Sequence, residues 1–411
     1  MQRSLQPDAR LPFVVLKSAG LHPLVYRKRI ARVDREAAAG DLIEVRDEEG
    51  QRVGFGLYNP KSELALRMLS RGDDLLDEAW WKTRLEEAVR LRREILRLDD
   101  NSDAYRLIHA EGDGLSGLVI DKLGDVLSVE CFSVGMYQRA LAIVELLAPL
   151  VGTSHYLIRG GPATVAQEGF EAEELSSPEL PKRVTIQEFG TRFRVDFAAG
   201  HKTGFFCDQR DNRRLLASFC RDKSVLDLCC YTGGFAIQAK KLGGAKDVIG
   251  VDLDADPLEL AKENANLNQV RVKFTQADAF AYIRDMFSTG RTFDVVVLDP
   301  PKLIRSRAEL EEGTRKHFDL SRLAMRLVTP GGIMLSCTCA GLLSHDEFQR
   351  LIYASARQAG RQVSPATDER GARHAQRHVQ ILAKTGAAAD HPVATNCPET
   401  EYLQAAFMRL L

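Results

Sequence analysis

The chain has 411 residues, of which 45% are hydrophobic and 27% are charged, so it is long enough for two or three domains. Its formal net charge of −1 does not by itself indicate a nucleic-acid-binding protein, and no stretch is apolar over the length that a membrane span or signal peptide requires. The eight cysteines contain no paired C-x-x-C motif, which argues against structural zinc. We expect a cytoplasmic protein with reduced thiols, no metal and no membrane contact.

The first part of the chain is predicted to be a small β-rich module. Residues 11–75 contain short apolar runs separated by turn residues such as Glu49-Gly50 and Asn59-Pro60. Residues 1–40 also carry eight basic and three acidic side chains, a local balance of 8 − 3 = +5. The basic side chains are Arg3, Arg10, Lys17, Arg27, Lys28, Arg29, Arg32 and Arg35. From charge alone, RNA binding and a solvated basic face are equally good interpretations.

A second unit is predicted to follow, beginning with a helix. Residues 77–98 repeat apolar residues at helical spacing with charges between them, and Trp80 and Trp81 in this helix are interpreted as packing residues. Beyond it, GLVIDKLGDVLSVECF predicts a hairpin, QRALAIVELLAPL a helix and HYLIRG a strand. The acidic segment 168–183 with its two prolines is expected to be a linker or surface loop. No catalytic constellation is found in this unit.

From about residue 184 onward, strands and helices alternate as in a doubly wound parallel sheet. In residues 225–235, VLDLCCYTGGF, an apolar strand is followed by Gly233-Gly234, which lets the chain turn tightly into a helix. A second apolar strand ends at Asp252, 252 − 234 = 18 residues past Gly234, where a carboxylate can accept hydrogen bonds from both ribose hydroxyls. There is neither a G-x-G-x-x-G for a pyrophosphate nor a G-K-[ST] for a triphosphate. The pattern therefore favours an adenosine ligand over a dinucleotide or a nucleoside triphosphate.

Four motifs in order carry a resemblance to a known family: D-L-x-x-Y-T-G-G-F, the V-D at Asp252, Asp278-Ala279 and Asp299-Pro300-Pro301-Lys302. They resemble class I S-adenosylmethionine-dependent methyltransferases. The blocks YRLIHAEGDGLSGLVIDKLGD, HKTGFFCDQRDNR and SCTCAGL are similar to those of large-subunit ribosomal RNA cytosine-5 methyltransferases that carry an N-terminal PUA domain, over nearly the whole chain. The resemblance implies an α/β protein with an N-terminal β-barrel PUA-like RNA-binding domain, a central α+β domain and a C-terminal Rossmann-like methyltransferase domain. Their expected boundaries are 1–75, 76–185 and 186–411. The segment EYLQAAFMRLL is expected to supply the antiparallel edge strand of the last domain.

The same resemblance implies S-adenosyl-L-methionine as cofactor and assigns residues to it. Phe206 and Gln209 would close over the cofactor, and Asp227 and Tyr231 would shape its methionine side. The turn at Gly233 would approach it, and Asp252 would hold the ribose. Asp278 and Ala279 would meet the adenine, while Asp299 would lie at the methyl-transfer end.

The predicted chemistry depends on Cys339. Carbon 5 of cytosine is a poor nucleophile, so enzymes that methylate it first add a thiolate to carbon 6, which makes carbon 5 enamine-like. Cys337 and Cys339 end an apolar strand and would point to the same face if the strand stays extended there. The family pattern S-C-x-G-L aligns with Cys339, which the resemblance therefore implies as nucleophile. Buried packing is the alternative role for both thiols.

Asp299 is the second predicted catalytic residue, since the adjacent prolines fix the backbone so that the acid faces the pocket. It could orient the cytosine amino group or help to manage its proton. Many cytosine-5 RNA enzymes have a second cysteine at this motif, which here is replaced by proline and lysine, so the base that removes the carbon-5 proton is left open.

The function that these residues predict is formation of 5-methylcytidine in 23S (large-subunit) rRNA through a cysteine-linked intermediate. Two alternatives stay open: methylation of a guanine nitrogen, with Cys339 structural, and a non-catalytic protein that binds S-adenosylmethionine and RNA. The expected partner is large-subunit rRNA, with a homodimer left open. His201 and His391 receive no catalytic role, and the polar region 362–389 is either a flap over the RNA or a loop.

Overall fold

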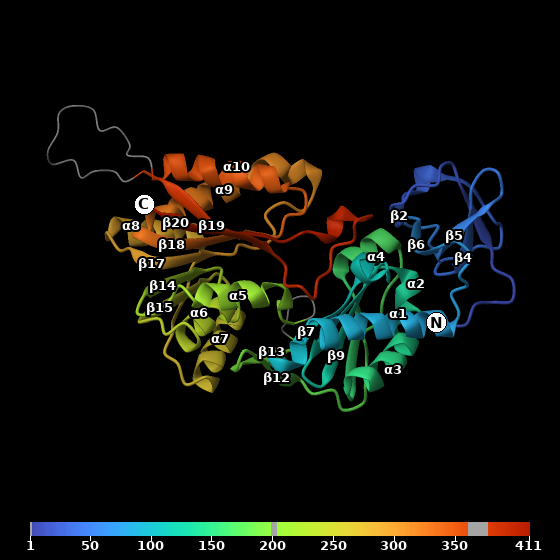
Figure 1. The fold of residues 1–411 in the computed structure, drawn as a ribbon, viewed down its shortest axis with the longest axis horizontal. Coiled ribbons are helices and arrows are strands. Elements are labelled where there is room, and N and C mark those ends of the chain that lie inside the picture. Colours follow the sequence, from blue (N-terminus) through green and yellow to red (C-terminus); the bar gives the residue numbers. More distant parts are fainter. Residues whose placement is uncertain (1, 199–203, 361–376) are drawn as a thin grey trace. The chain divides into compact units, whose positions relative to one another are not determined.

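The computed structural model describes residues 2–198, 204–360 and 377–411 and divides the chain into two compact units (Figure 1). The first unit comprises Met1–Glu188, Val195–Cys207 and Ala389–Thr400, and the second comprises Phe189–Arg194, Asp208–Ala388 and Glu401–Leu411. Each unit has its own hydrophobic cores. The three-domain division at residues 75 and 185 stays a prediction.

The β-rich module at the start of the chain is confirmed as a six-stranded sheet. The strand order is β2-β6-β5-β4-β1-β3. The strands β1 and β4 are parallel, and every other pair of neighbouring strands in this sheet is antiparallel. The strands are β1 Phe13–Leu16, β2 Leu24–Val25, β3 Ile30–Val33, β4 Leu42–Arg46, β5 Arg52–Tyr58 and β6 Leu66–Arg71. Val14, Ile43, Val45 and Leu66 are buried in its core, as expected where alternate strand residues face inward.

The predicted first helix of the central region is confirmed as α1 (Glu78–Arg90), which continues as a π-helical turn, η2 (Leu91–Ile95). The carboxylate of Asp77 accepts a hydrogen bond from the backbone N–H of Trp80 at 2.9 Å, which caps the helix. Trp81 is fully buried and Trp80 packs against the same core, so both tryptophans are packing residues.

The rest of this region is a five-stranded sheet with the order β11-β10-β9-β8-β7, in which β8 and β9 form the predicted hairpin. The acidic segment contributes the short edge strand β11, which pairs with β10. The strands are β7 Ala104–His109, β8 Leu118–Leu123, β9 Val126–Cys131, β10 His155–Gly160 and β11 Leu175–Ser176, and the helices are α2 Val134–Tyr137, α3 Ala140–Val151 and α4 Pro162–Glu168. A separate two-stranded sheet follows, formed by β12 (Arg183–Glu188) and β13 (Thr191–Asp196).

The second unit is built on a seven-stranded sheet with the order β16-β15-β14-β17-β18-β20-β19. Its strands are β14 Ser224–Leu228, β15 Asp247–Asp252, β16 Lys273–Gln276, β17 Phe293–Leu298, β18 Val328–Thr338, β19 Val379–Gly386 and β20 Gln404–Leu410. The first five in sequence are parallel, and β20 is antiparallel to both of its neighbours. The C-terminal segment is therefore antiparallel as predicted, but its expected place at the edge is wrong, because β19 lies outside it.

Helices cover both faces of this sheet (Figure 1). They are α5 Arg210–Ala217, α6 Gly234–Lys241, α7 Ala255–Leu267, α8 Ala279–Ser288, α9 Leu310–Arg326 and α10 His345–Gln358. Leu226 and Leu228 pack in the core under α8, α9 and α10, whereas Val225 packs with α5 and α6. Such alternation is what a strand buried on both faces requires, and it explains the continuous apolar runs in the sequence.

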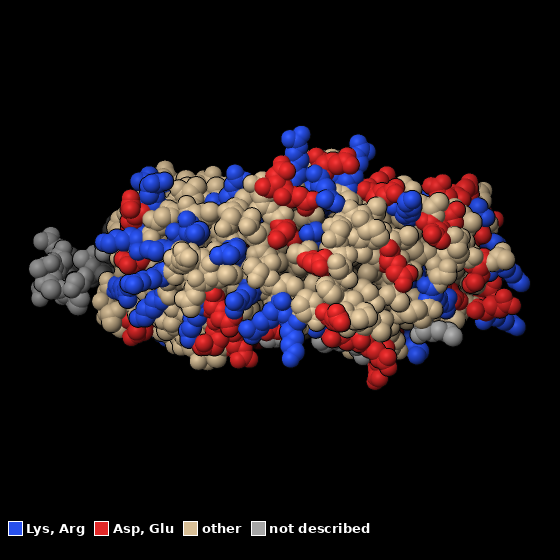
Figure 2. All heavy atoms as spheres, turned by 90° about the horizontal axis from the view of Figure 1, so that it is seen from below, with Lys and Arg blue, Asp and Glu red and all other residues tan. Residues whose placement is uncertain are grey.

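Short 3-10 turns link these elements: η1 Arg27–Arg29, η3 Leu98–Asp100, η4 Ala110–Asp113, η5 Cys207–Gln209, η6 Arg307–Glu309 and η7 Pro398–Thr400. In the part of the chain that the structure describes, no helix combines the length and apolar character of a membrane span. Basic and acidic side chains are interspersed over the face seen in Figure 2, in keeping with the net charge of −1.

Candidate active site

Three carboxylates come together at the carboxyl ends of neighbouring strands in the second unit. Asp227 lies in β14, Asp252 ends β15 and Asp299 directly follows β17, and these strands are adjacent and parallel. The charges of Asp299 and Asp252 both act on Asp227. Because the carboxyl ends of parallel strands share one edge of the sheet, these residues, distant in sequence, form one acidic cluster, and their roles toward a cofactor stay predictions.

The loop after β14 holds Asp252 in place. The backbone N–H of Tyr231 donates to Oδ2 of Asp252 at 2.7 Å, and the N–H of Asp254 donates to Oδ1 at 3.1 Å. To reach this position, Cys229 and Tyr231 adopt left-handed backbone conformations, with φ of 62° and 49°. Each carboxylate oxygen keeps a second lone pair, so Asp252 can still accept hydrogen bonds from hydroxyl groups.

Asp227 is fully buried and is only half satisfied by the protein. Its Oδ2 accepts a hydrogen bond from the backbone N–H of Ala236 at 3.0 Å, whereas Oδ1 has no partner among the described residues. Burial raises the pKa of this carboxyl well above its usual value, and the nearby charges of Asp299 and Asp252 raise it further. A ligand with a cationic donor group fits such a site, directly or through an ordered water, because it would satisfy the acceptor and offset the acidic charge.

Gly233 forms the tight turn that the sequence predicts. Its φ is +82°, and an added Cβ would lie 3.1 Å from both Ile237 and Phe274. The helix α6 begins at Gly234, one residue before Phe235, and its N-cap residue, Gly233, has no side chain that could cap the first turn. The carboxylate of Asp227 instead accepts a hydrogen bond from the N–H of Ala236, which brings the helix N-terminus close to the acidic strand ends.

Asp278 and Ala279 lie where the third strand leads into α8. Asp278 is exposed, and its Oδ1 accepts a hydrogen bond from the backbone N–H of Ala281 at 2.9 Å, which caps the helix. Ala279 is half-buried at the first helical position. The cap explains an acidic residue here without a ligand, so contact with an adenine stays a prediction.

Gln209 and Asp299 are in direct contact. The side-chain Nε2 of Gln209 donates to Oδ2 of Asp299 at 3.0 Å, and Gln209 is buried. Gln209 therefore lies beside Asp299, and its predicted role over the cofactor stays a prediction. Phe206 is half-buried and belongs to the first unit, so its predicted role over the cofactor stays a prediction.

The two cysteines near the end of β18 have different environments. The strand ends at Thr338, so the extended backbone that would place both thiols on one face stops before Cys339. Cys337 is fully buried in the core with Leu335 and Phe407, and burial raises the pKa of its thiol well above the usual value. Cys339 lies beyond the strand and is half-buried. Of the two, only Cys339 is accessible to a substrate.

The two cysteines in the loop after β14, Cys229 and Cys230, are poor candidates for a reactive thiol. Burial raises the pKa of the Cys229 thiol, and the charges of Asp252 and Asp299 raise it further. Cys230 is affected in the same way, first by burial and then by Asp227 and Asp252. Both therefore stay protonated thiols at neutral pH, as packing residues should.

Sequence reasoning missed two buried polar residues beside this site. His317 on α9 lies 3.1 Å through Nε2 from the carbonyl oxygen of Cys337, two residues before Cys339, and its pKa is lowered chiefly by burial. Asn212 on α5 is 2% exposed and donates to Oε1 of Gln209 at 2.7 Å. His317 belongs to no motif, whereas Asn212 lies inside the block HKTGFFCDQRDNR without a role assigned to it, so no signal in the linear sequence indicated either contact.

Some residues singled out in the sequence lie elsewhere. His201 and residues 362–376 of the polar region 362–389 fall outside the described residues, whereas Val379–Gly386 of that region forms β19 rather than a flap or a loop. Arg377 donates to the carbonyl oxygens of Met325 and Val328 at 2.7 and 2.6 Å, which gives it a structural role in the second unit.

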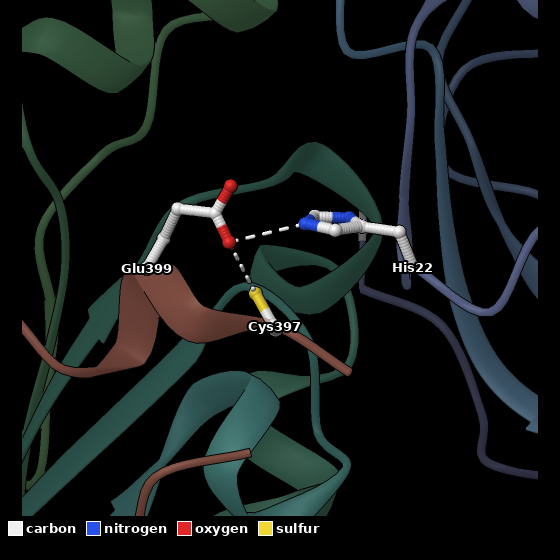
Figure 3. A group of neighbouring side chains, drawn as sticks. All are labelled: His22, Cys397 and Glu399. Carbon is white, nitrogen blue, oxygen red and sulfur yellow. Dashed lines mark hydrogen bonds and ion pairs between the residues drawn. The ribbon is translucent and has the colours of Figure 1, made fainter. Parts of the chain in front are cut away.

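A second group of chemically active side chains lies in the first unit and consists of His22, Cys397 and Glu399 (Figure 3). Oε2 of Glu399 lies 3.1 Å from Nε2 of His22 and 3.5 Å from Sγ of Cys397. The backbone N–H of Leu24 donates to Nδ1 of His22 at 3.1 Å, so the proton of the neutral ring lies on Nε2 and points at Glu399. A metal ion would need the lone pair of Nε2, which is occupied by the proton in this tautomer. The three side chains are therefore arranged for hydrogen bonding rather than for metal binding.

Comparison with known proteins places the chain among methyltransferases. Residues 105–361 match a family model described as S-adenosylmethionine-dependent methyltransferase, and residues 17–71 match a PUA-like domain. Two curated relatives, from Cronobacter sakazakii and Vibrio cholerae, are both named ribosomal RNA large subunit methyltransferase I. Each is 36% identical to the chain and covers 93% of it and 94% of the relative.

Solved structures share the fold. SMU.776, described as a methyltransferase and solved in complex with SAH, has a TM-score of 0.77 at 19% identity and covers 97% of this chain and 99% of its own. A Streptococcus mutans protein described as a SAM-dependent methyltransferase has a TM-score of 0.76 at 18% identity, with the same coverage. At this identity the likeness establishes the architecture alone.

Proposed function

The chain belongs to the S-adenosylmethionine-dependent methyltransferase family, together with the ribosomal RNA large subunit methyltransferases I, and from this premise we propose that it forms 5-methylcytidine in large-subunit (23S) rRNA. The observation that carries the proposal is the match to these rRNA methyltransferases over 93% of the chain. The acidic strand ends and the accessible Cys339 supply the chemistry that such a reaction needs.

The cofactor we propose is S-adenosyl-L-methionine, whose sulfonium supplies the methyl group. Asp252 would accept the ribose hydroxyls, and Asp227 would face the ammonium group of the methionine part, where its Oδ1 lacks a donor among the described residues. Three carboxylates suit a ligand that carries two positive charges and one negative charge. Gly233 and Tyr231 would shape the loop around it, and Asp278 and Ala279 would lie at the adenine end.

In the proposed mechanism, Cys339 acts as the nucleophile. A bond forms between its thiolate sulfur and carbon 6 of the cytosine, and the electron pair of the carbon 5–carbon 6 double bond moves to carbon 5. Carbon 5 would then form the new bond to the methyl carbon while the bond between that carbon and the sulfonium sulfur breaks, and the sulfur would keep the electron pair as a neutral thioether. Loss of the carbon-5 proton and departure of the sulfur from carbon 6 restore the double bond and free the thiolate. The base that takes this proton is not assigned.

Asp299 would hold the base for this reaction. As an acceptor at the methyl-transfer end, its carboxylate matches the amino group on carbon 4 of cytosine. A guanine-nitrogen methyltransferase could use the same Asp-Pro-Pro motif without a thiol. The different burial of Cys337 and Cys339 supports the cytosine reaction, since Cys339 lies beyond the end of β18 and is only half-buried, whereas Cys337 is fully buried.

The RNA would be held in part by the PUA-like domain. Lys17, Lys28, Arg32 and Arg35 are exposed on this domain and can contact phosphates. A substrate of this kind would place the protein in the cytoplasm. A homodimer stays a prediction that sedimentation of the intact chain can check.

The test is transfer of tritiated methyl from S-adenosylmethionine to unmodified large-subunit rRNA, followed by identification of the product nucleoside. We expect 5-methylcytidine with the intact protein and a loss of at least about 10³-fold in transfer with Cys339→Ala, because the covalent route is removed. Calorimetry should show that this variant still binds the cofactor.

Cys220→Ala is the matched control, since Cys220 is a fully buried thiol that packs in a core of the same unit with Leu216 and Val225 and whose Sγ donates to the carbonyl oxygen of Leu216. It should keep most of its activity. Product found as a methylated guanosine, or full activity of Cys339→Ala, would contradict the proposal. Loss of activity in Cys337→Ala alone would show that the wrong cysteine has been assigned.

A further inference from the structure

A chain of buried amide groups leads from the edge strand of the second unit to Asp299. Nδ2 of Asn212 donates to the carbonyl oxygen of Gly386 in β19 at 3.1 Å and to Oε1 of Gln209 at 2.7 Å. Nε2 of Gln209 in turn donates to Oδ2 of Asp299 at 3.0 Å. We call the groups of Gly386, Asn212, Gln209 and Asp299 the amide relay.

The direction of the amide relay is set by the backbone. The carbonyl of Gly386 can only accept a hydrogen bond, so the side chain of Asn212 must turn its NH₂ group toward it. Thr385 supports this orientation, because its hydroxyl donates to Oδ1 of Asn212 at 2.6 Å. The second N–H of Asn212 then faces Oε1 of Gln209, which leaves the NH₂ group of Gln209 facing Asp299.

Burial makes this orientation matter. Asn212 is 2% exposed and Gln209 is 4% exposed, so water cannot replace a lost partner at low cost. Oε1 of Gln209 accepts from Asn212 and its Nε2 donates to Asp299, so the amide is fixed at both atoms, and rotation by half a turn would bring its carbonyl oxygen against the Asp299 carboxylate.

We propose that Asn212 and Gln209 are positioning residues, which keep Asp299 ionised and aimed as a hydrogen-bond acceptor for the amino group of the target base. The proposal deepens the proposed function and rests on it. An N–H donor on one carboxylate oxygen stabilises the charged form and restricts rotation of the group. An acceptor held in this way pairs with the amino group of cytosine and disfavours uracil, which has a carbonyl oxygen at the same position.

Other titratable groups face Asp299 and have to be considered in any test. Among the described residues they include Asp227 on β14, Cys229 in the loop after it, and Cys337 on β18. The carboxylate among them disfavours a further negative charge, whereas the N–H donor from Gln209 favours ionisation of Asp299.

Two isosteric substitutions, Asn212→Asp and Gln209→Glu, each replace an amide of the amide relay by a carboxylate. A hydrogen-bond donor is thereby exchanged for an acceptor without loss of a heavy atom. In Asn212→Asp, two carboxylate oxygens face Gly386 and Gln209, so the amide of Gln209 must turn over. In Gln209→Glu, a carboxylate faces Asp299 directly. For each variant we expect kcat to fall by about 10²-fold and the midpoint of the acidic limb of the pH–rate profile to rise by about one unit or more. For Asn212→Asp, the Kd for S-adenosylmethionine should change by less than about threefold.

Asn268→Asp is the matched control. Asn268 is another buried asparagine of the second unit, and its Nδ2 also donates to two carbonyl oxygens, those of Arg192 at 2.6 Å and Asn264 at 2.8 Å. This variant loses comparable hydrogen bonds away from Asp299. It should therefore lose stability but keep the pH–rate profile of the wild type.

The measurement is methyl transfer to unmodified large-subunit rRNA between pH 5 and 9, together with thermal unfolding of each variant. If Gln209→Glu is folded and keeps the wild-type profile, the proposal is overturned, and this variant decides alone should Asn212→Asp fail to fold. A shift shared equally by Asn268→Asp would also overturn it. If the wild type forms no 5-methylcytidine, the proposed function fails instead, and the two failures are therefore distinct.

Discussion

At the scale of single residues, the loop after β14 has strained backbone conformations, and the surrounding contacts offset their cost in free energy. Left-handed conformations at non-glycine residues cost about 1 kcal/mol each, and both Cys229 and Tyr231 adopt them. The hydrogen bonds from Cys230 to Val251 and from Tyr231 to Asp252 hold the loop in this shape. These hydrogen bonds thus hold the strained loop in line with the acidic strand ends.

Gly233→Ala is predicted to weaken cofactor binding. The substitution adds a methyl group 3.1 Å from Ile237 and Phe274 at a φ of +82°, so the loop must move. We expect a loss of about 1–3 kcal/mol in stability and at least about tenfold weaker binding of S-adenosylmethionine, measured by calorimetry.

Gly244→Ala is the control that separates the cost of a positive φ from the cost of steric contact with neighbouring side chains. Gly244 has a φ of +66°, but an added Cβ would meet nothing within 4 Å. This control should lose about 1 kcal/mol in stability and bind the cofactor normally. Equal cofactor affinity in the two variants would show that the position of Gly233 does not matter for the ligand.

At the scale of elements, the 3-10 turn η1 concentrates positive charge on the PUA-like domain. Its three residues are Arg27, Lys28 and Arg29, and the first two are exposed. Arg27 donates to the carbonyl oxygen of Ser62, which ties the turn to the loop before β6. The local basic balance seen in the sequence is therefore presented at least in part on one ordered turn.

Lys28→Ala is predicted to weaken binding to large-subunit rRNA by a few-fold and to lower the slope of log K against log salt by about 1, as loss of one phosphate contact should. Filter binding at several salt concentrations measures both. Lys82→Ala is the control, because Lys82 lies on α1 with its ammonium 3.8 Å from Glu86. If the slope of log K against log salt is unchanged in Lys28→Ala, Lys28 does not contact an RNA phosphate.

At the scale of the whole molecule, the first unit includes a segment from near the C-terminus of the chain. Ala389–Thr400 belongs to this unit although β19 and β20 on either side of it belong to the second. Arg92, which is fully buried, pairs with Asp113 at 2.6 Å and donates to the carbonyl oxygen of Asp390 at 2.7 Å. His109 lies in the same buried cluster, where Arg106 donates to its Nδ1 at 3.0 Å.

This cluster should make stability depend on pH. Burial, then the charges of Arg106 and His391, lower the pKa of His109 to about 2, so the ring is neutral in the folded state. In the unfolded state its pKa is about 6.5, so below that pH the unfolded chain binds a proton that the folded chain does not. The stabilising contribution is therefore full above pH 6.5 and is lost progressively as the pH falls toward 2.

The prediction is that lowering the pH from 7.5 to 5.5 destabilises the wild type by about 1 kcal/mol more than His109→Gln, which can keep an acceptor for Arg106 but does not titrate. Urea unfolding followed by fluorescence at both pH values measures the difference. An equal pH effect in the two proteins would mean that His109 does not control this response.

Much of the architecture and most of the acidic site could be predicted from the sequence, because both depend on local patterns. Apolar runs with turn residues specify strands, and a carboxylate at the end of each parallel strand must reach the same edge of the sheet. Asp227, Asp252 and Asp299 therefore come together for reasons visible in the linear chain. The β-rich first module and the helix after it follow in the same way from periodicity.

Only the tertiary structure decided the features that depend on residues far apart in sequence. The place of β20 inside the sheet, the burial of Cys337 beside an accessible Cys339, and the contact of Asn212 with Gly386 involve partners that no short motif links. The assignment of residues 389–400 to the first unit is of the same kind. The physical reason is that burial and hydrogen-bond direction are properties of packed neighbours, whereas periodicity and turn chemistry are properties of the chain itself.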